Sequence, residues 1–183
     1  MILCPVMAGL VPAIHVFTLS KDKTWMPGTR PGMTRHENLR RIIMAYWLLK
    51  TEPEEFSWDD QVRRGAKGET WSGVRNFTAR RHLQEMKKGD RFFFYHTGDE
   101  KRVVGIGAVI REAYADPTAN KGEPWVAVQT GALEPLPKPV TLAAIKAEPK
   151  LKDMALVKYS RLSVQPVNAE EWKIVGKMGG LKG

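Results

Sequence analysis

Cysteine is almost absent from this chain of 183 residues, and its one cysteine, Cys4, stands close to the N-terminus. A single cysteine excludes a disulfide framework within the chain. Residues 44–183 contain no cysteine, which excludes a cysteine-based zinc site and a thiol nucleophile from that part of the sequence. A reducing, cytoplasmic location is therefore the simplest expectation.

Long hydrophobic runs are also missing. No apolar run approaches the ~18 residues that a membrane-spanning helix needs. The apolar stretch at residues 1–19 is interrupted by Pro5 and Pro12, and no lysine or arginine precedes Lys21. A signal peptide has a positive segment before its apolar run, and prolines break the helical period of an amphipathic anchor. We therefore expect no membrane partner.

The familiar motifs of enzymes are absent too. Neither His82 nor His96 has a cysteine or a second histidine at metal-ligand spacing. The Gly-Ile-Gly at residues 105–107 lacks the further glycine of a dinucleotide fold, and it more readily permits close packing or a bulge in a bent strand. Adjacent Asp59 and Asp60 would point about 100° apart on a helix, where their place in the first turn explains them electrostatically. We expect no enzyme, no metal and no cofactor.

Composition indicates one globular domain of moderately basic charge. The chain is 43% hydrophobic, which suffices for one core. Of its 29 basic and 20 acidic residues, six and two lie within residues 1–43, so residues 44–183 carry a net charge of about +5 out of the total of +9. This charge is compatible with phosphate contacts and equally with simple solubility.

Residues 1–43 differ from the rest of the chain. The segment at 26–33 is rich in proline and glycine, and with residues 6–16 it resembles translated intergenic repeats of some bacterial genomes. We interpret residues 1–43 as a disordered extension or a mis-assigned start. Met44 is then the natural first residue, and residues 44–183 form the domain.

Within that domain, short strands in the middle and helices at the edges predict an α+β fold. Predicted strands occupy residues 46–50, 91–97, 103–112, 125–133 and 162–167. Predicted helices begin near Ser57, Asn76, Thr141 and Asn168, and the serine and the two asparagines are good N-caps. We expect a small curled sheet or barrel with flanking helices.

The segment at residues 71–80, Trp-Ser-Gly-Val-Arg-Asn-Phe-Thr-Ala-Arg, holds the densest chemistry. A flat indole can stack on a base, an amide can donate to and accept from a base edge, and arginines can hold phosphates. The same residues also fit a tryptophan packed in a core and followed by the basic face of a helix. Composition leaves both interpretations open.

Several further segments accompany it in a fixed order: residues 46–53, 56–60, 93–96, 112–118 and 159–167. Together with residues 71–80, this succession closely resembles the EVE domain, a PUA-like family, over about residues 44–181. The resemblance implies a PUA-like fold. It also implies kinship with YTH domains, which hold a methylated adenine in an aromatic cage, and recognition of modified bases in DNA or RNA.

The resemblance assigns candidate roles to residues of this chain. Trp71 looks like the cage tryptophan and would be the stacking wall, Asn76 and Thr51 would read the base edge, and Tyr114 or Trp125 would be a second wall. Phosphates would be contacted by Lys50, Arg75, Arg80 and Arg161. Structural alternatives stay open, because Asn76 also suits an N-cap and Arg161 could pair with Glu52 or Asp116. For Trp47 and Trp58 we expect core positions, and for Tyr95 and His96 packing or capping is an equal alternative.

The function implied is a non-catalytic module that recognises a modified base in an aromatic pocket. We expect methylated or oxidised cytosine in DNA as the partner, with DNA favoured over RNA, and a separate effector protein. One alternative is an RNA-binding PUA-like module acting on transfer or ribosomal RNA. Another is a protein or enzyme that binds a small free nucleotide.

Overall fold

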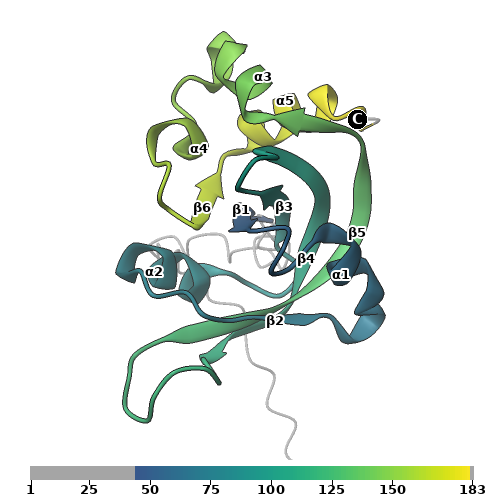
Figure 1. Ribbon diagram of the computed structural model, residues 1–183. Coiled ribbons are helices and arrows are strands. Elements are labelled where there is room, and N and C mark those ends of the chain that lie inside the picture. Colours follow the sequence, from purple (N-terminus) through teal and green to yellow (C-terminus); the bar gives the residue numbers. More distant parts are fainter. Residues whose placement is uncertain (1–43, 182–183) are drawn as a thin grey trace, which may run out of the picture. The chain divides into compact units, whose positions relative to one another are not determined.

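The computed structural model describes residues 44–181, and the predictions for residues 1–43 lie outside this range. Figure 1 shows the elements in space. The strands are β1 (Tyr46–Thr51), β2 (Glu69–Trp71), β3 (Arg91–His96), β4 (Arg102–Ala115), β5 (Val126–Thr141) and β6 (Val164–Val167). The helices are α1 (Trp58–Arg63), α2 (Phe77–Glu85), α3 (Leu142–Ala147), α4 (Ala155–Lys158) and α5 (Ala169–Met178), with 3-10 turns η1 (Gly65–Lys67) and η2 (Pro149–Leu151).

All the described strands belong to one six-stranded sheet in the order β2-β5-β4-β3-β1-β6. Strands β1 and β3 run parallel, and every other neighbouring pair is antiparallel. The register shifts several times between the long strands β4 and β5, and such bulges bend a sheet. Within residues 44–181 the edges β2 and β6 do not pair, so the sheet is curled but open. The predicted α+β class is confirmed, and the sheet stops short of a closed barrel.

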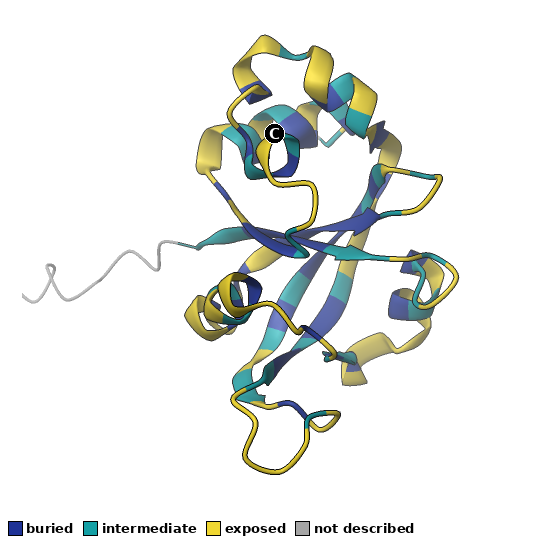
Figure 2. Cartoon of the chain, turned by 60° about the vertical axis from the view of Figure 1, so that its left-hand side comes forward, coloured by how far each residue is buried: buried dark blue, intermediate teal, exposed yellow. Residues whose placement is uncertain are grey.

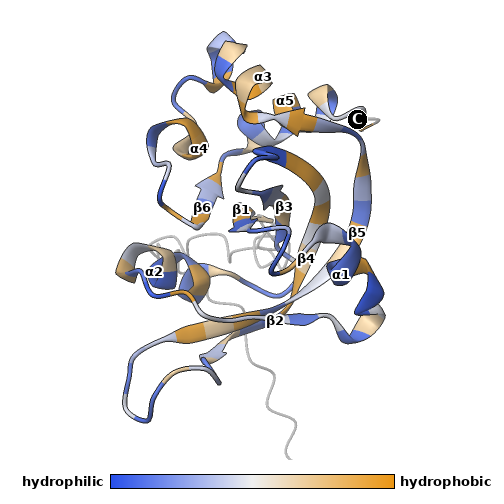
Figure 3. Cartoon of the chain, in the orientation of Figure 1, coloured by the Kyte–Doolittle hydropathy of each residue, from blue (hydrophilic) through white to orange (hydrophobic). Residues whose placement is uncertain are grey.

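Two hydrophobic cores lie on the two faces of this sheet. In β3, Phe93 faces one core and Phe94 faces the other, which explains a strand that is apolar at successive positions. Figures 2 and 3 show the buried and hydrophobic residues gathered on the central strands. The α5 core comprises Leu48, Phe93, Tyr95, Val103, Ile106, Leu136, Val140, Ile145, Leu151, Met154, Leu156, Val167, Trp172 and Val175. The α2 core comprises Trp47, Leu49, Trp58, Trp71, Val74, Ala79, Leu83, Met86, Phe92, Phe94, Val109, Val128 and Val164.

The helix starts follow the predicted caps. Ser57 and Asp60 form a capping box at α1, and Asn168 and Glu171 form another at α5. Asn76 accepts a hydrogen bond from the backbone of Ala79 and caps α2. Asp60 is thus occupied by the cap, where the hydrogen bonds from Ser57 and then from Arg63 lower its pKa to about 2. The electrostatic explanation of this aspartate is confirmed.

Gly105 confirms the prediction of close packing. A Cβ atom at this position would lie 2.5 Å from the ring of Trp58, so only glycine lets α1 approach β4 this closely. Trp58 and Trp47 are core residues, as predicted.

The sequence-based bounds are too short for β4 and β5, and β2 and α4 were not predicted. The second half of β5 contains Pro135, Pro137 and Pro139, which argue against a strand. There β5 pairs with β4 on one side only, because β2 pairs only with residues 128–130. Pro137 and Pro139 are tolerated because they lie in the register shift between the pairs Gly105–Pro135 and Val103–Val140 and have no partner residue in β4. No helix within residues 44–181 is long and apolar enough to cross a membrane.

Candidate functional site

A cleft of about 680 Å³ opens where the end of β1, the loop after β2 and the loop before β6 meet. It is lined by Lys50, Thr51, Glu52, Glu55, Phe56, Arg64, Glu69, Thr70, Trp71, Ser72, Gly73, Val74, Arg75, Thr97, Ser160, Arg161 and Ser163. Its apolar residues, Phe56, Trp71 and Val74, belong to the α2 core or pack against it. The volume lies within the range of small-molecule sites, and the lining is mostly polar.

Trp71 serves both the core and the cleft. It ends β2 and is 7% exposed, so most of its surface is packed inside the domain. The rings of Phe56 and Phe94 meet it at 84° and 89°, with centroids 6.3 and 5.6 Å away. No aromatic ring of the described residues stacks parallel on Trp71, and its small exposed part lines the cleft. Its role as a stacking wall stays a prediction.

The loop after Trp71 is anchored by a buried carboxylate. The side chain of Asp116, which is 0% exposed, accepts hydrogen bonds from the Gly73 N–H at 2.9 Å and from the Arg75 guanidinium at 2.7 Å. The N–H and hydroxyl of Thr118 donate to its other oxygen, at 2.8 and 2.7 Å. Gly73 takes a φ of +77°, a conformation that favours glycine.

The pKa of Asp116 results from two opposed effects. Burial alone would raise it, but the hydrogen bonds from Arg75, Thr118 and Gly73 outweigh burial and hold the pKa at about 2. The ionised carboxylate thus ties the cleft loop to the loop between β4 and β5.

Lys50 and Thr51 reach the cleft from the end of β1. Lys50 Nζ donates to the carbonyl oxygen of Ser160 at 3.0 Å, and burial lowers the pKa of this lysine to about 8. Thr51 Oγ1 donates to the carbonyl of Phe56 at 3.2 Å. The hydroxyl of Thr51 therefore has its proton engaged and faces a ligand as an acceptor.

A second cleft of about 670 Å³ adjoins the first and shares Ser160 and Arg161 with it. Asn76 lines this second cleft, and its side-chain oxygen is occupied by the Ala79 N–H at 2.9 Å. The capping role of Asn76 is confirmed, whereas reading of a base edge stays a prediction. Within residues 44–181 Arg161 forms an ion pair with neither Glu52 nor Asp116, and Asp116 pairs with Arg75 instead.

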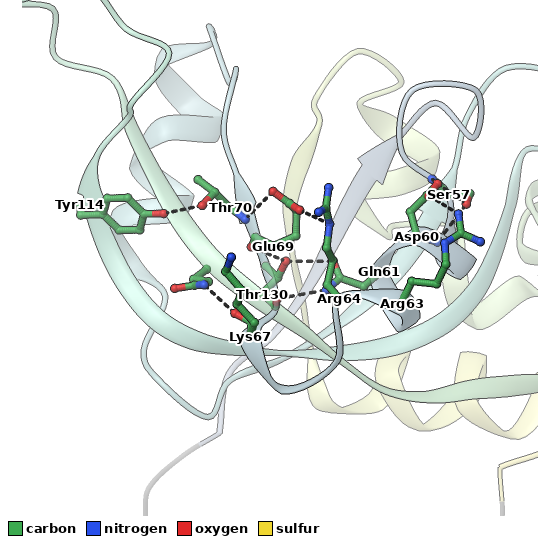
Figure 4. A network of polar contacts seen from close by, with 11 residues as sticks. Ser57, Asp60, Gln61, Arg63, Arg64, Lys67, Glu69, Thr70, Tyr114 and Thr130 are labelled. Carbon is green, nitrogen blue, oxygen red and sulfur yellow. Dashed lines mark hydrogen bonds and ion pairs between the residues drawn. The ribbon is translucent and has the colours of Figure 1, made fainter.

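Tyr114, Trp125 and Arg80 lie outside the lining of the first cleft. The Tyr114 hydroxyl donates to Thr70 Oγ1 at 2.9 Å, as Figure 4 shows, and thereby supports a cleft residue from behind. The Trp125 ring lies 5.7 Å from the guanidinium of Arg75 and supports it similarly. Arg80 donates to the carbonyl of Pro124 at 3.3 Å. Their predicted contacts with base and phosphate stay predictions.

The carboxylates of the cleft were given no ligand-binding role from the sequence, where Glu52 was considered only as an ion-pair partner of Arg161. Glu52 lies within the family-like segment at residues 46–53, and Glu55 directly precedes the one at residues 56–60, which was the available signal. Nothing local pointed to Glu69, whose carboxylate pairs with Arg64 at 2.5 Å and accepts from the Thr70 N–H at 3.1 Å (Figure 4). The cleft thus offers carboxylate acceptors as well as cations.

His96 is buried and has a structural part. Its Nε2 accepts from the backbone N–H of Trp58 at 3.0 Å, while Nδ1 lies 2.5 Å from the carboxylate of Glu100. The histidine therefore holds the start of α1, and the capping alternative is confirmed. Tyr95 is also buried, which raises its pKa to about 12. Between residues 44 and 181 no three histidine, cysteine or acidic side chains are grouped to hold a metal ion.

This chain is similar in sequence and in fold to several known proteins. Human thymocyte nuclear protein 1 is 29% identical over 170 residues, covering 76% of each chain, and the chicken protein is 32% identical over 166 residues, covering 74% of this chain and 69% of the relative. The NMR structure of Rpa0253 from Rhodopseudomonas palustris is 61% identical, with a TM-score of 0.71 and coverage of 74% and 93%. The crystal structure of human THYN1 in complex with 5-methylcytosine-containing DNA is 29% identical, with a TM-score of 0.70 and coverage of 76% and 99%. The EVE domain family matches residues 45–178, and the chain therefore belongs to this family.

Proposed function

We propose that this domain is a non-catalytic module that binds DNA and holds one modified cytosine in the cleft beside Trp71. The observation that carries the proposal is the cleft itself, whose lining combines the tryptophan Trp71 with cations and carboxylates. The proposal is supported by the human relative, which was solved with 5-methylcytosine-containing DNA and aligns with this chain at a TM-score of 0.70.

The lining of the cleft suits a cytosine. Contact of a base with an aromatic side chain is worth roughly 1–3 kcal/mol, and burial of a methyl group adds about 0.8 kcal/mol. The amino group of cytosine donates hydrogen bonds, and the carboxylates of Glu52 and Glu55 accept them. Thr51 adds a further acceptor, because its own proton is engaged by Phe56.

The cations of the cleft suit the backbone of the strand. Lys50 and Arg161 both lie beside Ser160, so phosphates next to the bound base would meet them together. With few phosphate contacts, binding should be weak and should fall as salt is raised. A module of this kind acts by bringing a separate effector protein to the modified site.

The proposal is tested by binding of the full chain to short oligonucleotides with one central cytosine that is unmodified, methylated, hydroxymethylated or carboxylated. Each sequence is used as DNA and as RNA, single-stranded and as a duplex. We expect a preference for one modified cytosine in DNA. Trp71→Ala should lower the affinity for that oligonucleotide roughly tenfold, as expected for loss of a base-aromatic contact.

The matched control is Trp172→Ala. Trp172 is 8% exposed and lies in the α5 core, so its loss damages packing as severely as the loss of Trp71 but away from the cleft. Binding is measured where circular dichroism shows both variants folded. Equal weak binding to all oligonucleotides, or equal losses in both variants, would overturn the proposal. A rise of the melting temperature with free nucleosides alone would favour a nucleotide-binding protein instead.

A further inference from the structure

Phe77 is the most exposed of the large hydrophobic side chains within residues 44–181, with 66% of its surface accessible. It is the first residue of α2 and follows the cleft loop by two positions, since Arg75 still lines the cleft. The exposed ring thus follows, along the chain, Arg75 of the first cleft and Asn76 of the cleft that adjoins it. Figure 1 shows the start of α2 near the strands β4 and β5.

The Phe77 ring has a stiff support. Trp125 packs against it with ring centroids 5.0 Å apart at 40°, and the guanidinium of Arg75 lies 5.7 Å from the Trp125 ring. Arg75 is fixed in turn by the fully buried carboxylate of Asp116. The carboxylate that positions the cleft loop therefore also supports the exposed ring.

Positive charge surrounds the ring. The guanidinium of Arg80 lies 5.4 Å from the Phe77 centroid, and the guanidinium of Arg75 lies 5.7 Å from the ring of Trp125, which packs against Phe77. Arginines beside an apolar projection match the phosphates that border a base step.

A base in a duplex reaches a pocket only when it is turned out of the stack, which costs a few kcal/mol. Proteins that distort a duplex insert apolar side chains between base steps. An inserted ring restores part of the stacking that the extruded base gives up. The side chain that does this must be apolar, exposed, firmly supported and close to the pocket, and Phe77 meets each condition.

We propose that Phe77 is a wedge that enters double-stranded DNA at the position vacated by the modified cytosine. This inference rests on the proposed function and extends it to the duplex form of the ligand. In a single strand no stacked partner has to be replaced. The wedge should therefore matter for duplexes and hardly at all for single strands.

The test compares the full chain with Phe77→Ala, Phe77→Leu and Val62→Ala on the preferred modified cytosine, in a duplex and in the same single strand. Val62 is 49% exposed on α1 and serves as the control for loss of an exposed apolar side chain. We expect Phe77→Ala to weaken duplex binding roughly tenfold and single-strand binding less than about threefold. Phe77→Leu should retain most duplex affinity, because leucine is also used as a wedge.

The outcomes separate the two proposals. Equal losses on duplex and single strand, or no loss on either, would overturn the wedge while leaving the base reader intact. A dimer that Phe77→Ala dissolves without changing DNA binding would make this surface a contact between copies of the chain, and would also overturn it. If the unmodified protein prefers no modified base in either form, the proposed function fails and the wedge fails with it.

Discussion

The two faces of the sheet are built from the same strands, but the tryptophans that cover them pack differently. On the α5 side, Trp172 stacks nearly parallel on Tyr46 and on Phe93, with centroids 4.4 and 4.0 Å away and planes within 20°. On the α2 side, Trp71 meets Phe94 edge to face and has no parallel neighbour among the described rings. Both faces of the Trp172 ring therefore pack within the α5 core, whereas Trp71 lines a cleft.

The two sides also differ in their buried polar groups. The Asp90 carboxylate accepts from the Trp47 indole at 3.0 Å, Asp116 holds the cleft loop, and His96 holds the start of α1. All three serve the α2 side. Apolar packing supplies stability wherever it is complete, whereas hydrogen-bonded buried groups fix particular geometries. The α5 side has a buried polar anchor as well, because Gln165 lies opposite Leu48 and donates to the carbonyls of Tyr159 and Leu162. The α2 side, which carries the cleft, is the one where three such anchors hold a loop, a helix start and an indole.

The largest effect should come from Trp172→Ala. Removal of a buried indole from a completed core costs about 3–5 kcal/mol of unfolding free energy. Denaturant unfolding measures the loss, and titration of the folded variant should give unchanged affinity for the preferred oligonucleotide. A variant that keeps its stability, or that loses binding while folded, would contradict the separation of the two faces.

Asp116→Asn should have the next largest effect. The asparagine amide keeps the shape of the side chain but loses the negative charge to which Arg75, Thr118 and Gly73 donate hydrogen bonds. This loss should lower the free energy of unfolding by about 2 kcal/mol. Arg75 is 37% exposed, so its lost ion pair costs less than a fully buried one would. Oligonucleotide affinity should fall as well, because the cleft loop loses its anchor.

The pH dependence of stability provides the check on Asp116. Its pKa is depressed in the folded protein, so its contribution is complete above about pH 4, near the ordinary aspartate value, and is lost as the pH falls toward 2. The difference between the native protein and Asp116→Asn should shrink over this interval. Asp153→Asn is the control, because Asp153 forms an exposed ion pair with Lys158 on its own surface. The free energy of unfolding of Asp153→Asn should not differ measurably from that of the native protein at any pH.

Titration of Lys50 should make oligonucleotide affinity depend on pH, with a smaller effect than that of Asp116→Asn. Its pKa of about 8 means that raising the pH from 7 to 9 removes the charge from most molecules. Loss of one phosphate contact should weaken binding by roughly fivefold over this range, with the affinity falling as the pH rises. Lys50→Arg keeps its charge throughout and should flatten the profile. An unchanged slope in that variant would assign the pH dependence to another group.

The sequence predicted local features well because they depend on neighbouring residues. The caps at Ser57 and Asn168 and the aromatic strand β3 needed no long-range information. The three-residue strand β2 exists only through its pairing with β5, and no local pattern of that length predicts a strand.

The cleft was predictable only in part for the same reason. Trp71 and Arg161 were singled out, and the structure places both on its lining. Tyr114 or Trp125 was expected as a second wall. Both lie outside the lining of the first cleft, where the Tyr114 hydroxyl donates to Thr70, and their contact with a base stays a prediction. Asp116 was considered as a partner for Arg161, and the folded loop brings Arg75 to it instead. Such choices between partners depend on tertiary geometry.

Asn76 should give the smallest effect and separates two roles that the sequence could not. Asn76→Ala removes the N-cap and should cost about 1 kcal/mol of stability, whereas Asn76→Ser restores a capping oxygen and should cost only a few tenths. Serine keeps a capping oxygen but has no amide that could read a base edge. Because Asn76 lines the second cleft, we expect Asn76→Ser to change oligonucleotide affinity less than about threefold. A folded Asn76→Ser variant of full stability that lost the preference for the modified base would contradict this expectation. It would show that the Asn76 side chain contacts the base, so that one residue of the α2 side both caps the helix and recognises the ligand.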